Sequence, residues 1–469
     1  MCDDSVPLPQ GELLKDGKML KWRVKRWFWI EVDPPRLVYS GSQGGSARGS
    51  YSLDNCYCRA DISGTGPDRL CAIVLMLPLG IRKFFPVQEM GGADERERAV
   101  ESWVEALTYV CNRVAARHHM QLQLKKHIGS GLNSHVYLAL RENCGDVVAC
   151  KITDKQRMGP ESADMLETEA AMHSQLLALG CDRILKLLGA NIKDDPFRAY
   201  LVTEFCSGGE VFEYATSLPA ERFNERMVAD IMHSVLQCVH VMHSNGFVHR
   251  DLKLENILLS TRDTFLPIPQ RIKVADFGFI CRPNGHRLTL QCGTPAYWAP
   301  EIITASRDKP YEGCPVDMWS LGVMLYVLLT SSYPFNPEAD DVDLEAAITS
   351  GTYDKQRLEA VSLHARSLVL ALLQLDPSQR LTVSQALQHP FISQCGAPDV
   401  KPSPRRASTA SDKLRRTVTV IRGYQRVLRC FGGQEQPTLK RTASGQQQLE
   451  VGFVHHARSR RALHVTFNL

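Results

Sequence analysis

The sequence predicts an α+β fold, in which strand-rich segments precede helices and the chain forms more than one domain. The chain has 469 residues, and because a domain usually has about 150 residues, we expect two or three domains. Residues 9–118 contain short runs rich in aromatic and β-branched residues, which are typical of strands. From residue 94 the apolar side chains instead recur with the period of a helix. The first domain is therefore predicted to be a β-rich module that ends in a helix.

The strands of this module are separated by turn-forming residues. Asp33-Pro34-Pro35 favours a turn between two strand-like runs, and the Gly/Ser-rich segment 40–50 predicts a loop. A strand is predicted to open at 11–15, and four more are predicted at 27–32, 36–40, 71–77 and 81–87. The helix that follows has one apolar face, which we expect to pack on the strands and which carries Val100, Trp103, Val104, Leu107 and Val110.

Strands that are closed by a helix with a central Trp103 and opened by Gly11-Glu12-Leu13-Leu14-Lys15 resemble a pleckstrin-homology domain. The resemblance implies a β-barrel capped by the helix. It also implies that the basic first hairpin binds an inositol phosphate headgroup through charge-assisted hydrogen bonds, with Lys15, Arg23, Lys25 and Arg26 as the candidates. Val24 stands where the phosphoinositide-binding form has a cation. A protein-docking surface and a merely solvated basic hairpin therefore remain alternatives.

One stretch of nine residues, 248–256, points to phosphoryl transfer. It places Asp251, Lys253 and Asn256 at fixed spacing after an apolar segment. A carboxylate can accept the proton of an attacking hydroxyl, a cation can stabilise a phosphoryl group, and an amide oxygen can bind a metal ion. His-Arg-Asp alone also occurs in salt-bridged turns without a catalytic role, but the complete stretch favours catalysis.

Further motifs follow the order and spacing found in protein kinases. Residues 128–136 form a glycine-rich segment between two strand-like runs, where backbone N–H groups can approach phosphates. Lys151 ends an apolar run, and Asp276-Phe277-Gly278 comes 25 residues after Asp251. Together these motifs resemble the protein kinase family over residues 121–393. The resemblance implies a bilobal fold with a small β-rich N-lobe and a large helical C-lobe.

The resemblance also implies a role for each C-lobe motif, with ATP and Mg²⁺ as the cofactors. Asp251 would be the catalytic base, and Lys253 would contact the γ-phosphate. Asn256 and Asp276 would bind the metal ion. Lys253, two residues after the base, is typical of serine/threonine kinases.

In the N-lobe, Lys151 would contact the α- and β-phosphates and pair with a Glu of the helix that follows. Glu169 is preferred to Glu167, because apolar side chains at helical spacing turn its face to the core. The nucleotide site implied by the resemblance also includes Ile128, Gly129, Ser130, Gly131, Ser134, Val136, Ala149, Thr203, Glu204, Cys206 and Glu210.

The segment between Gly278 and Glu301 resembles an activation segment. Its last part, 292–301, contains Thr294 and ends at Glu301, whose expected buried partner is Arg380. Arg250 is expected to be an unpaired cation that a phosphate neutralises. Thr289 is the only hydroxyl residue between Gly278 and Gly293, so it is the predicted phosphosite.

Two carboxylates, Glu210 and Glu255, lie at positions where basophilic kinases receive Arg side chains of the substrate. They predict a preference for Arg at positions −3 and −2 before the phosphoacceptor. Ser408 and Ser444 follow such Arg residues and are candidate phosphosites. The sequences of these motifs most resemble the calcium/calmodulin-dependent group, while the order of the two domains resembles the Akt family. The alternative function is a catalytically inactive phosphoinositide-binding scaffold, which the complete catalytic motif set disfavours.

Residues 394–469 are predicted to form a basic, largely disordered regulatory tail. From residue 401 the tail has fourteen Lys/Arg and three Asp/Glu, a charge of +11, so the preceding residues carry −7 of the total of +4. The segment 413–430 combines Arg with apolar residues, which suits calmodulin, an anionic membrane surface or an autoinhibitory contact. A disordered basic tail without a partner is the alternative, and no nucleic-acid partner is predicted.

The cysteine usage and the apolar runs predict a cytoplasmic protein that membranes recruit peripherally, if at all. The fifteen Cys residues lack the spacing of a zinc site, which indicates reduced thiols. No secretory signal is recognisable after Met1. The apolar runs at 70–81 and 321–330 are shorter than a membrane span requires.

Overall fold

The computed structural model describes residues 8–16, 23–63, 69–78, 80–86, 92–131, 133–158, 162–217 and 224–393, together with three strands of the tail. The described residues divide into two compact units. The first unit comprises Met1–Ala163 and Gly189–Val202, and the second comprises Asp164–Leu188 and Thr203–Leu469. The chain therefore leaves the first unit after residue 163 and returns to it at residues 189–202, which hold most of two further strands.

The first unit begins with a seven-stranded antiparallel sheet of order β4-β3-β2-β1-β7-β6-β5. Its strands are β1 (Gln10–Asp16), β2 (Arg23–Val32), β3 (Pro35–Ser40), β4 (Ala47–Ser52), β5 (Tyr57–Ser63), β6 (Leu70–Leu77) and β7 (Gly80–Pro86). All five strands predicted from the sequence are confirmed. The predicted loop 40–50 is wrong at its end, because Ala47 already pairs with β3 and tertiary pairing outweighs weak strand propensity.

The sheet does not close into the β-barrel that the resemblance to a pleckstrin-homology domain implies. Among the described strands, β4 and β5 are the two ends of the sheet and each pairs with one neighbour. The helix that follows, α1 (Ala93–Met120), covers the sheet as expected, and its predicted apolar face is buried. We call residues 8–120, the sheet with α1, the module.

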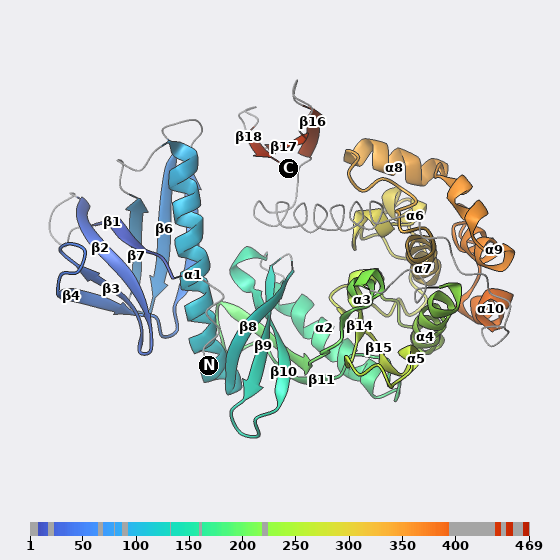
Figure 1. Cartoon of the computed structure of the whole chain (residues 1–469), viewed down its shortest axis with the longest axis horizontal. Coiled ribbons are helices and arrows are strands. Elements are labelled where there is room, and N and C mark those ends of the chain that lie inside the picture. Colours follow the sequence, from blue (N-terminus) through green and yellow to red (C-terminus); the bar gives the residue numbers. More distant parts are fainter. Residues whose placement is uncertain are drawn as a thin grey trace. The chain divides into compact units, whose positions relative to one another are not determined.

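Helix α1 is buried on a second face as well. Tyr109, Asn112 and Ala116 are buried there, because a second sheet lies on the side of α1 away from the module sheet (Figure 1). This sheet has the order β11-β12-β10-β9-β8. Its strands are β8 (Leu122–Ser130), β9 (Ser134–Arg141), β10 (Val147–Asp154), β11 (Leu187–Asn191) and β12 (Arg198–Glu204). The helix ends at Met120. The next residue, Gln121, donates its N–H to Arg117 O, and its left-handed backbone turns the chain into β8.

The second unit is mainly helical. Its helices are α2 (Ser162–Leu177), α3 (Val211–Ser217), α4 (Glu225–Ser244), α5 (Ile268–Arg271), α6 (Pro300–Ile303), α7 (Gly313–Thr330), α8 (Asp341–Ser350), α9 (Leu363–Leu372), α10 (Val383–Gln388) and α11 (Pro390–Ser393). A small sheet of β13 (Gly209–Glu210), β14 (Ile257–Leu259) and β15 (Ile272–Val274) lies among them. Helix α4 begins at Glu225, where the side chain of Asn224 accepts the N–H of Met227.

Helix α7 is the centre of the second unit. It is buried along most of its length, and Trp319 stacks on Phe335. Within the part of the chain that the structure describes, α7 is the helix whose length and apolar composition would suit a membrane span, and 83% of that window is buried inside the protein. The sequence analysis counted only the apolar run 321–330, but the helix begins earlier, at Gly313. The expectation that the apolar segments are too short for a membrane span is therefore wrong for the length of this helix.

The tail contributes backbone strands β16 (Pro437–Arg441), β17 (Gln447–Phe453) and β18 (Leu463–Asn468), which pair in that order. Ser408, Ser444 and the predicted calmodulin segment 413–430 lie outside the described residues.

Candidate active site

The stretch 248–256 follows α4 and is anchored by Asp317 of α7. The Asp317 carboxylate accepts the backbone N–H of His249 at 2.9 Å and that of Arg250 at 2.8 Å. These bonds hold Arg250 at a φ of 66°, in the left-handed region that non-glycine residues rarely adopt. Gly293 packs so closely that a Cβ there would overlap Arg250 O. The core of the second unit therefore sets the direction of the next residue, Asp251.

The sequence analysis missed His243, which supports this anchor from the end of α4. Its Nε2 lies 2.8 Å from Asp317 Oδ2. Burial lowers the pKa of His243, but hydrogen bonds to Asp317 and Cys314 and the charge of Asp317 outweigh it and raise the pKa to about 9. Burial raises the pKa of Asp317, yet the hydrogen bond and charge of His243 hold this pKa below its usual value. At neutral pH the pair is therefore an imidazolium and a carboxylate.

Replacing His243 by Gln is expected to remove a pH-dependent part of the stability. The pKa of His243 is raised from 6.5 to about 9 on folding, so the folded state binds this proton more tightly. The stabilisation is fully present below pH 6.5 and is lost as the pH rises through 9, with a maximum of about 3 kcal/mol. Urea denaturation of both proteins between about pH 6 and about pH 9.5 measures the difference in unfolding free energy.

The exposed His286 of the activation segment offers the matched control, His286→Gln. This variant should follow the wild-type curve. A difference between wild type and His243→Gln that stays constant from the acidic to the basic end of the range would contradict the assignment of the charged pair.

Asp251 lies at the centre of a buried polar cluster. Its Oδ1 accepts the hydroxyl of Thr294 at 2.7 Å, and Lys253 Nζ lies 2.9 Å from its Oδ2. Lys253 Nζ also donates to the Thr294 hydroxyl at 2.8 Å. Asn256 Nδ2 donates to Asp251 O at 2.8 Å, so the side-chain oxygen of Asn256 is the atom suited to a metal ion. The structure thus brings four of the predicted site residues together.

The charge of this cluster suits the binding of a phosphoryl group. Burial lowers the pKa of Lys253, but the negative charges of Asp251, Glu255 and Asp276 outweigh it, and the pKa ends above its usual value. Lys253 is therefore a fixed cation. Asp276 faces outward at a positive φ of 60°, while the next residue, Phe277, is buried with its ring 4.5 Å from that of His173 and 5.3 Å from that of His249.

These residues fit a magnesium ion. Mg²⁺ in nucleotide enzymes usually has one or two carboxylate or amide ligands from the protein and takes the rest from phosphates and water. Asp276 and Asn256 supply one carboxylate and one amide oxygen, and both belong to the second unit.

The N-lobe candidates lie on the first unit and on α2. Gly131 N–H donates to Ser134 O at 2.7 Å, and a Cβ on Gly131 would overlap the Ser134 hydroxyl, so the glycine-rich turn requires glycine here. Lys151 pairs with Val136 across the β9–β10 ladder, which also holds Ala149. Ile128, Gly129 and Ser130 end β8. On α2, Glu169 is buried and Glu167 is only half-buried. This agrees with the prediction that the face of α2 with Glu169 is turned to the core.

The end of β12 is held by an ion pair and a hydrogen bond that the sequence did not reveal. Glu204 accepts the N–H of Lys186 at 2.9 Å and pairs with Lys273 Nζ at 2.8 Å. Its backbone carbonyl can still accept from a purine. Thr203 precedes Glu204 in the same strand, and Cys206 is buried with Ala275. Glu210, which was predicted to contact both substrate and nucleotide, ends β13 of the small sheet and pairs with Leu258.

The activation segment is held by direct hydrogen bonds. Arg250 Nε donates to Phe279 O at 2.7 Å, but a backbone carbonyl carries no counter-charge, so the neutralisation of Arg250 by a phosphate stays a prediction. Leu288 and Tyr311 exchange two backbone hydrogen bonds, both at 2.8 Å, and the Tyr311 hydroxyl donates to Leu290 O. Thr289 between these contacts is exposed, and its phosphorylation stays a prediction.

The expected partner of Glu301 is confirmed. Arg380 binds the Glu301 carboxylate with both arms of its guanidinium, at 2.7 and 3.1 Å. The Tyr297 hydroxyl lies 3.4 Å from Glu255 Oε2, which places this candidate substrate carboxylate beside the activation segment.

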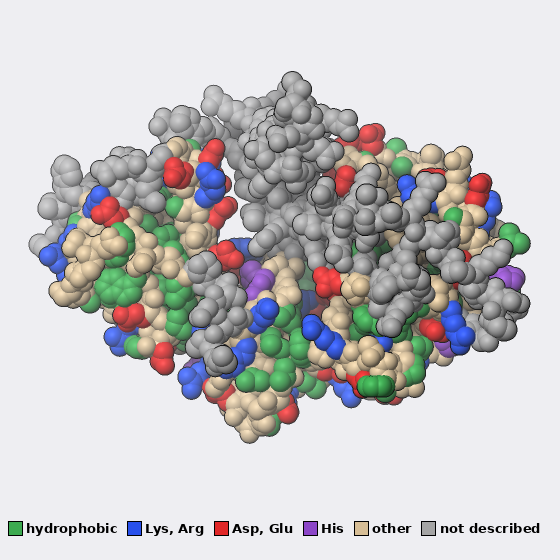
Figure 2. Space-filling view, viewed as in Figure 1, with side chains coloured by type: hydrophobic (Ala, Val, Ile, Leu, Met, Phe, Trp, Pro, Cys, Tyr) green, Lys and Arg blue, Asp and Glu red, His purple; other side chains and the backbone are tan. Residues whose placement is uncertain are grey.

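Each headgroup candidate of the module has a contact inside the protein. Lys15 Nζ lies 3.4 Å above the ring of Tyr39, Arg23 lies over Phe85, and Lys25 pairs with Glu12 at 2.7 Å. Arg26 donates to the backbone O of Lys25. On the face in Figure 2, acidic and basic side chains of the described residues are interspersed. Headgroup binding by these four side chains stays a prediction.

Comparison with known proteins agrees with this geometry. The model of the protein kinase domain matches residues 122–392. The chain is 36% identical over 277 residues to the phosphorylase b kinase gamma catalytic chain, liver/testis isoform, of Rattus norvegicus, which covers 57% of this chain and 65% of that protein. It is 36% identical over 273 residues to the calcium/calmodulin-dependent protein kinase type 1 of Macrobrachium nipponense, covering 58% of this chain and 74% of that protein.

A probable serine/threonine-protein kinase of Dictyostelium discoideum is 33% identical over 274 residues, which cover 58% of this chain and 44% of that protein. The chain thus spans less than two thirds of the length of the phosphorylase kinase and Dictyostelium relatives. The matched domain nevertheless takes up more than half of the chain, and it contains Asp251, Lys253, Asn256 and Asp276. The chain therefore belongs to the protein kinase family.

Proposed function

We propose that the protein is a serine/threonine protein kinase that transfers the γ-phosphoryl group of ATP to a protein hydroxyl. The observation that carries this proposal is the buried cluster in which Asp251 contacts Thr294, Lys253 and Asn256. Among the described residues, this cluster combines a carboxylate base, a fixed cation and an amide metal ligand on a backbone that Asp317 anchors.

The residues divide the chemistry between them. Asp251 Oδ accepts the proton of the substrate hydroxyl as the oxygen attacks, and Lys253 stabilises the negative charge of the transferred group. Asp276 and Asn256 would hold Mg²⁺, which neutralises the phosphate oxygens when bound. Lys151 and the glycine-rich turn around Gly131 orient the remaining phosphates.

The direct test is phosphate transfer from radiolabelled ATP, in the presence of Mg²⁺, to a library of Ser/Thr peptides. We expect phosphoserine or phosphothreonine on peptides with upstream Arg. A protein that binds ATP but labels no peptide or protein would overturn the proposal and would favour the alternative of an inactive scaffold.

Substrate choice is proposed to depend on Glu255 and Glu210. Replacing Glu255 by Ala is expected to raise KM for a peptide with Arg at −2 and −3 by about 10-fold or more, since a charge-assisted hydrogen bond contributes about 1.5–3 kcal/mol. The turnover number should change little, because Glu255 does not touch the transferred group. Steady-state kinetics with peptides in which one Arg at a time becomes Ala identify the position that each carboxylate reads.

The Arg-to-Ala peptides also serve as the control. Wild type and Glu255→Ala should have the same KM for the peptide that lacks the Arg read by Glu255. An equal loss of activity towards all peptides would show that Glu255 acts on the fold, through Tyr297, and not on the substrate.

Two regulatory ligands belong to this proposal. Calmodulin binding at 413–430 is supported by the basic, apolar sequence and by the similarity to a protein named calcium/calmodulin-dependent protein kinase type 1. A pleckstrin-homology-like role for the module, with recruitment from the cytoplasm to anionic membranes, is supported by its seven strands followed by a helix. Adding calcium–calmodulin, or vesicles with and without phosphoinositide, to the peptide assay should change the rate. An unchanged rate with either ligand would remove that ligand from the proposal.

A further inference from the structure

The module and the five-stranded sheet share one hydrophobic core. Phe28 of the module sheet, Trp103 of α1 and Tyr137 of β9 belong to the same cluster of buried side chains. Helix α1 lies between the two sheets and contributes to both sides (Figure 1). The module is therefore part of the first unit, which also contains Lys151 and the glycine-rich turn.

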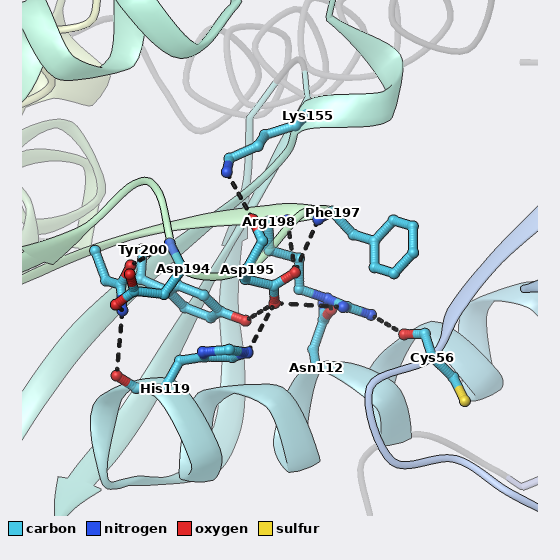
Figure 3. A network of polar contacts seen from close by, with 10 residues as sticks. Cys56, Asn112, His119, Lys155, Asp194, Asp195, Phe197, Arg198 and Tyr200 are labelled. Atoms are coloured by element: carbon cyan, nitrogen blue, oxygen red, sulfur yellow. Dashed lines mark hydrogen bonds and ion pairs between the residues drawn. The ribbon is translucent and has the colours of Figure 1, made fainter. Parts of the chain in front are cut away.

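A buried arginine joins the two sheets. Arg198, the first residue of β12, donates from Nε to Asn112 Oδ1 of α1 at 2.7 Å and from Nη2 to Cys56 O of the module at 2.6 Å (Figure 3). Its side chain is 4% exposed. Among the described residues Nη1 has no hydrogen-bond partner, so the bonds from Nε and Nη2 are the ones that stabilise this buried guanidinium and fix the module against β12.

Asp195 holds this arginine in place. Its Oδ1 accepts the backbone N–H groups of Phe197 and Arg198, and its Oδ2 accepts the Tyr200 hydroxyl at 2.5 Å. The same Oδ2 lies 3.6 Å from Arg198 Nη1. Asp195 and Arg198 thus form a buried pair of opposite charge, close to the end of β10, because Lys155 Nζ donates to Asp195 O at 2.6 Å (Figure 3).

A second contact from the module reaches the same place. The Tyr57 hydroxyl of β5 donates to Asp154 Oδ2 at 2.8 Å, and the Tyr57 ring stacks on Phe197 with centroids 5.4 Å apart. Burial and the charge of Asp154 raise the pKa of Tyr57, so the hydroxyl keeps its proton and remains a donor. Tyr57 is 5% exposed.

Asp154 connects this contact to both nucleotide motifs of the first unit. It is the last residue of β10, three residues after Lys151. Its backbone N–H donates to Asn133 O of the glycine-rich turn at 2.7 Å. Its Oδ1 accepts the N–H of Gln156 and thereby caps the N-terminus of the short helix Lys155–Arg157. A shift of Asp154 therefore moves the turn and the end of the Lys151 strand together.

We propose that Tyr57 is a positioning residue for phosphoryl transfer, through which the module sets the glycine-rich turn and the Lys151 strand by way of Asp154. This inference rests on the proposed kinase function. It assigns the module a direct part in ATP use, in addition to any ligand that the module binds. Arg198 and Asp195 complete the same connection by fixing Phe197, on which Tyr57 stacks.

The test is Tyr57→Phe in the full-length chain, which removes one hydroxyl and keeps the stacked ring. We expect kcat/KM for ATP to fall about tenfold, since a small displacement of phosphate-binding groups has effects of this size. KM for the peptide should stay the same, because Glu210 and Glu255 lie on the other unit. Binding of a fluorescent ATP analogue should weaken in parallel.

The matched control is Tyr51→Phe. Tyr51 is a half-buried tyrosine of the module whose hydroxyl forms a hydrogen bond with Arg82 within the module. Tyr51→Phe therefore also removes one hydrogen-bonded hydroxyl, but at a position away from β10. A double-mutant cycle with Asp154→Ala checks the connection, because Tyr57→Phe should add no further loss in that background.

The outcomes separate the inference from the function on which it rests. A wild-type chain without phosphate transfer would refute the kinase proposal, while weaker analogue binding by Tyr57→Phe would still support the positioning role. Equal ATP parameters for Tyr57→Phe and Tyr51→Phe would overturn the inference. Additive losses in the cycle would also overturn it, because Tyr57 would then not act through Asp154.

Discussion

Replacing Asp251 by Asn is expected to lower the rate of phosphate transfer by about 10²–10⁴-fold, the usual contribution of a positioned general base. Asparagine has the shape of aspartate but cannot take the proton of the attacking hydroxyl. The anchoring bonds of Asp317 go to the backbone of His249 and Arg250, so they survive the change. Single-turnover measurements with saturating ATP isolate the transfer step.

Asp263→Asn is a suitable control for this experiment. Asp263 is an exposed residue of the second unit whose carboxylate accepts a local backbone N–H, at Phe265. This variant should transfer phosphate at the wild-type rate, and ATP should bind to wild type and Asp251→Asn with similar affinity. If Asp251→Asn retained more than about a tenth of the wild-type rate, Asp251 would not be the base.

Replacing Arg380 by Ala is expected to destabilise the second unit by about 3–5 kcal/mol, the cost of removing one partner of a buried ion pair. The Arg380 side chain is completely buried and Glu301 is 14% exposed. Besides Glu301, the guanidinium donates to Pro315 O at 2.6 Å and to Gln374 O at 3.0 Å. The variant leaves all three acceptors without this donor. Urea denaturation measures the change in unfolding free energy.

The exposed pair of Arg357 and Asp354 provides the comparison. Its atoms are 2.9 Å apart, but both side chains are about half exposed. Arg357→Ala should therefore cost at most about 1 kcal/mol. Equal losses for the two variants would mean that burial of the Arg380 pair contributes nothing beyond a surface contact.

Local motifs predicted much of the candidate site. Asp251, Lys253 and Asn256 lie within six residues, and the rigid backbone between them leaves little freedom in how they meet. Glu301 and Arg380 are far apart in the sequence, but the kinase motifs already pair them. The resemblance therefore supplied a long-range contact that periodicity does not predict.

The errors share a different cause. A sequence shows side-chain charges but not the backbone carbonyls around them, so the hydrogen bond from Arg250 to Phe279 O could not be predicted. The open sheet, the strand β5 and the role of His243 depend in the same way on tertiary contacts. Asn112 and Arg198, separated by 86 residues, give no pattern in the sequence that links one to the other.

The order in which the chain is synthesised gives the shared core of the first unit a further consequence. The module precedes β12 during translation, yet Asn112 on α1 meets its partner Arg198 only when the chain is 86 residues longer. Until then, the part of the shared core that Tyr200 and Val202 of β12 complete is exposed to solvent. We therefore expect a nascent chain that ends before β12 to remain bound to chaperones. Ribosome-bound chains of increasing length should lose that binding once residues 198–204 have emerged.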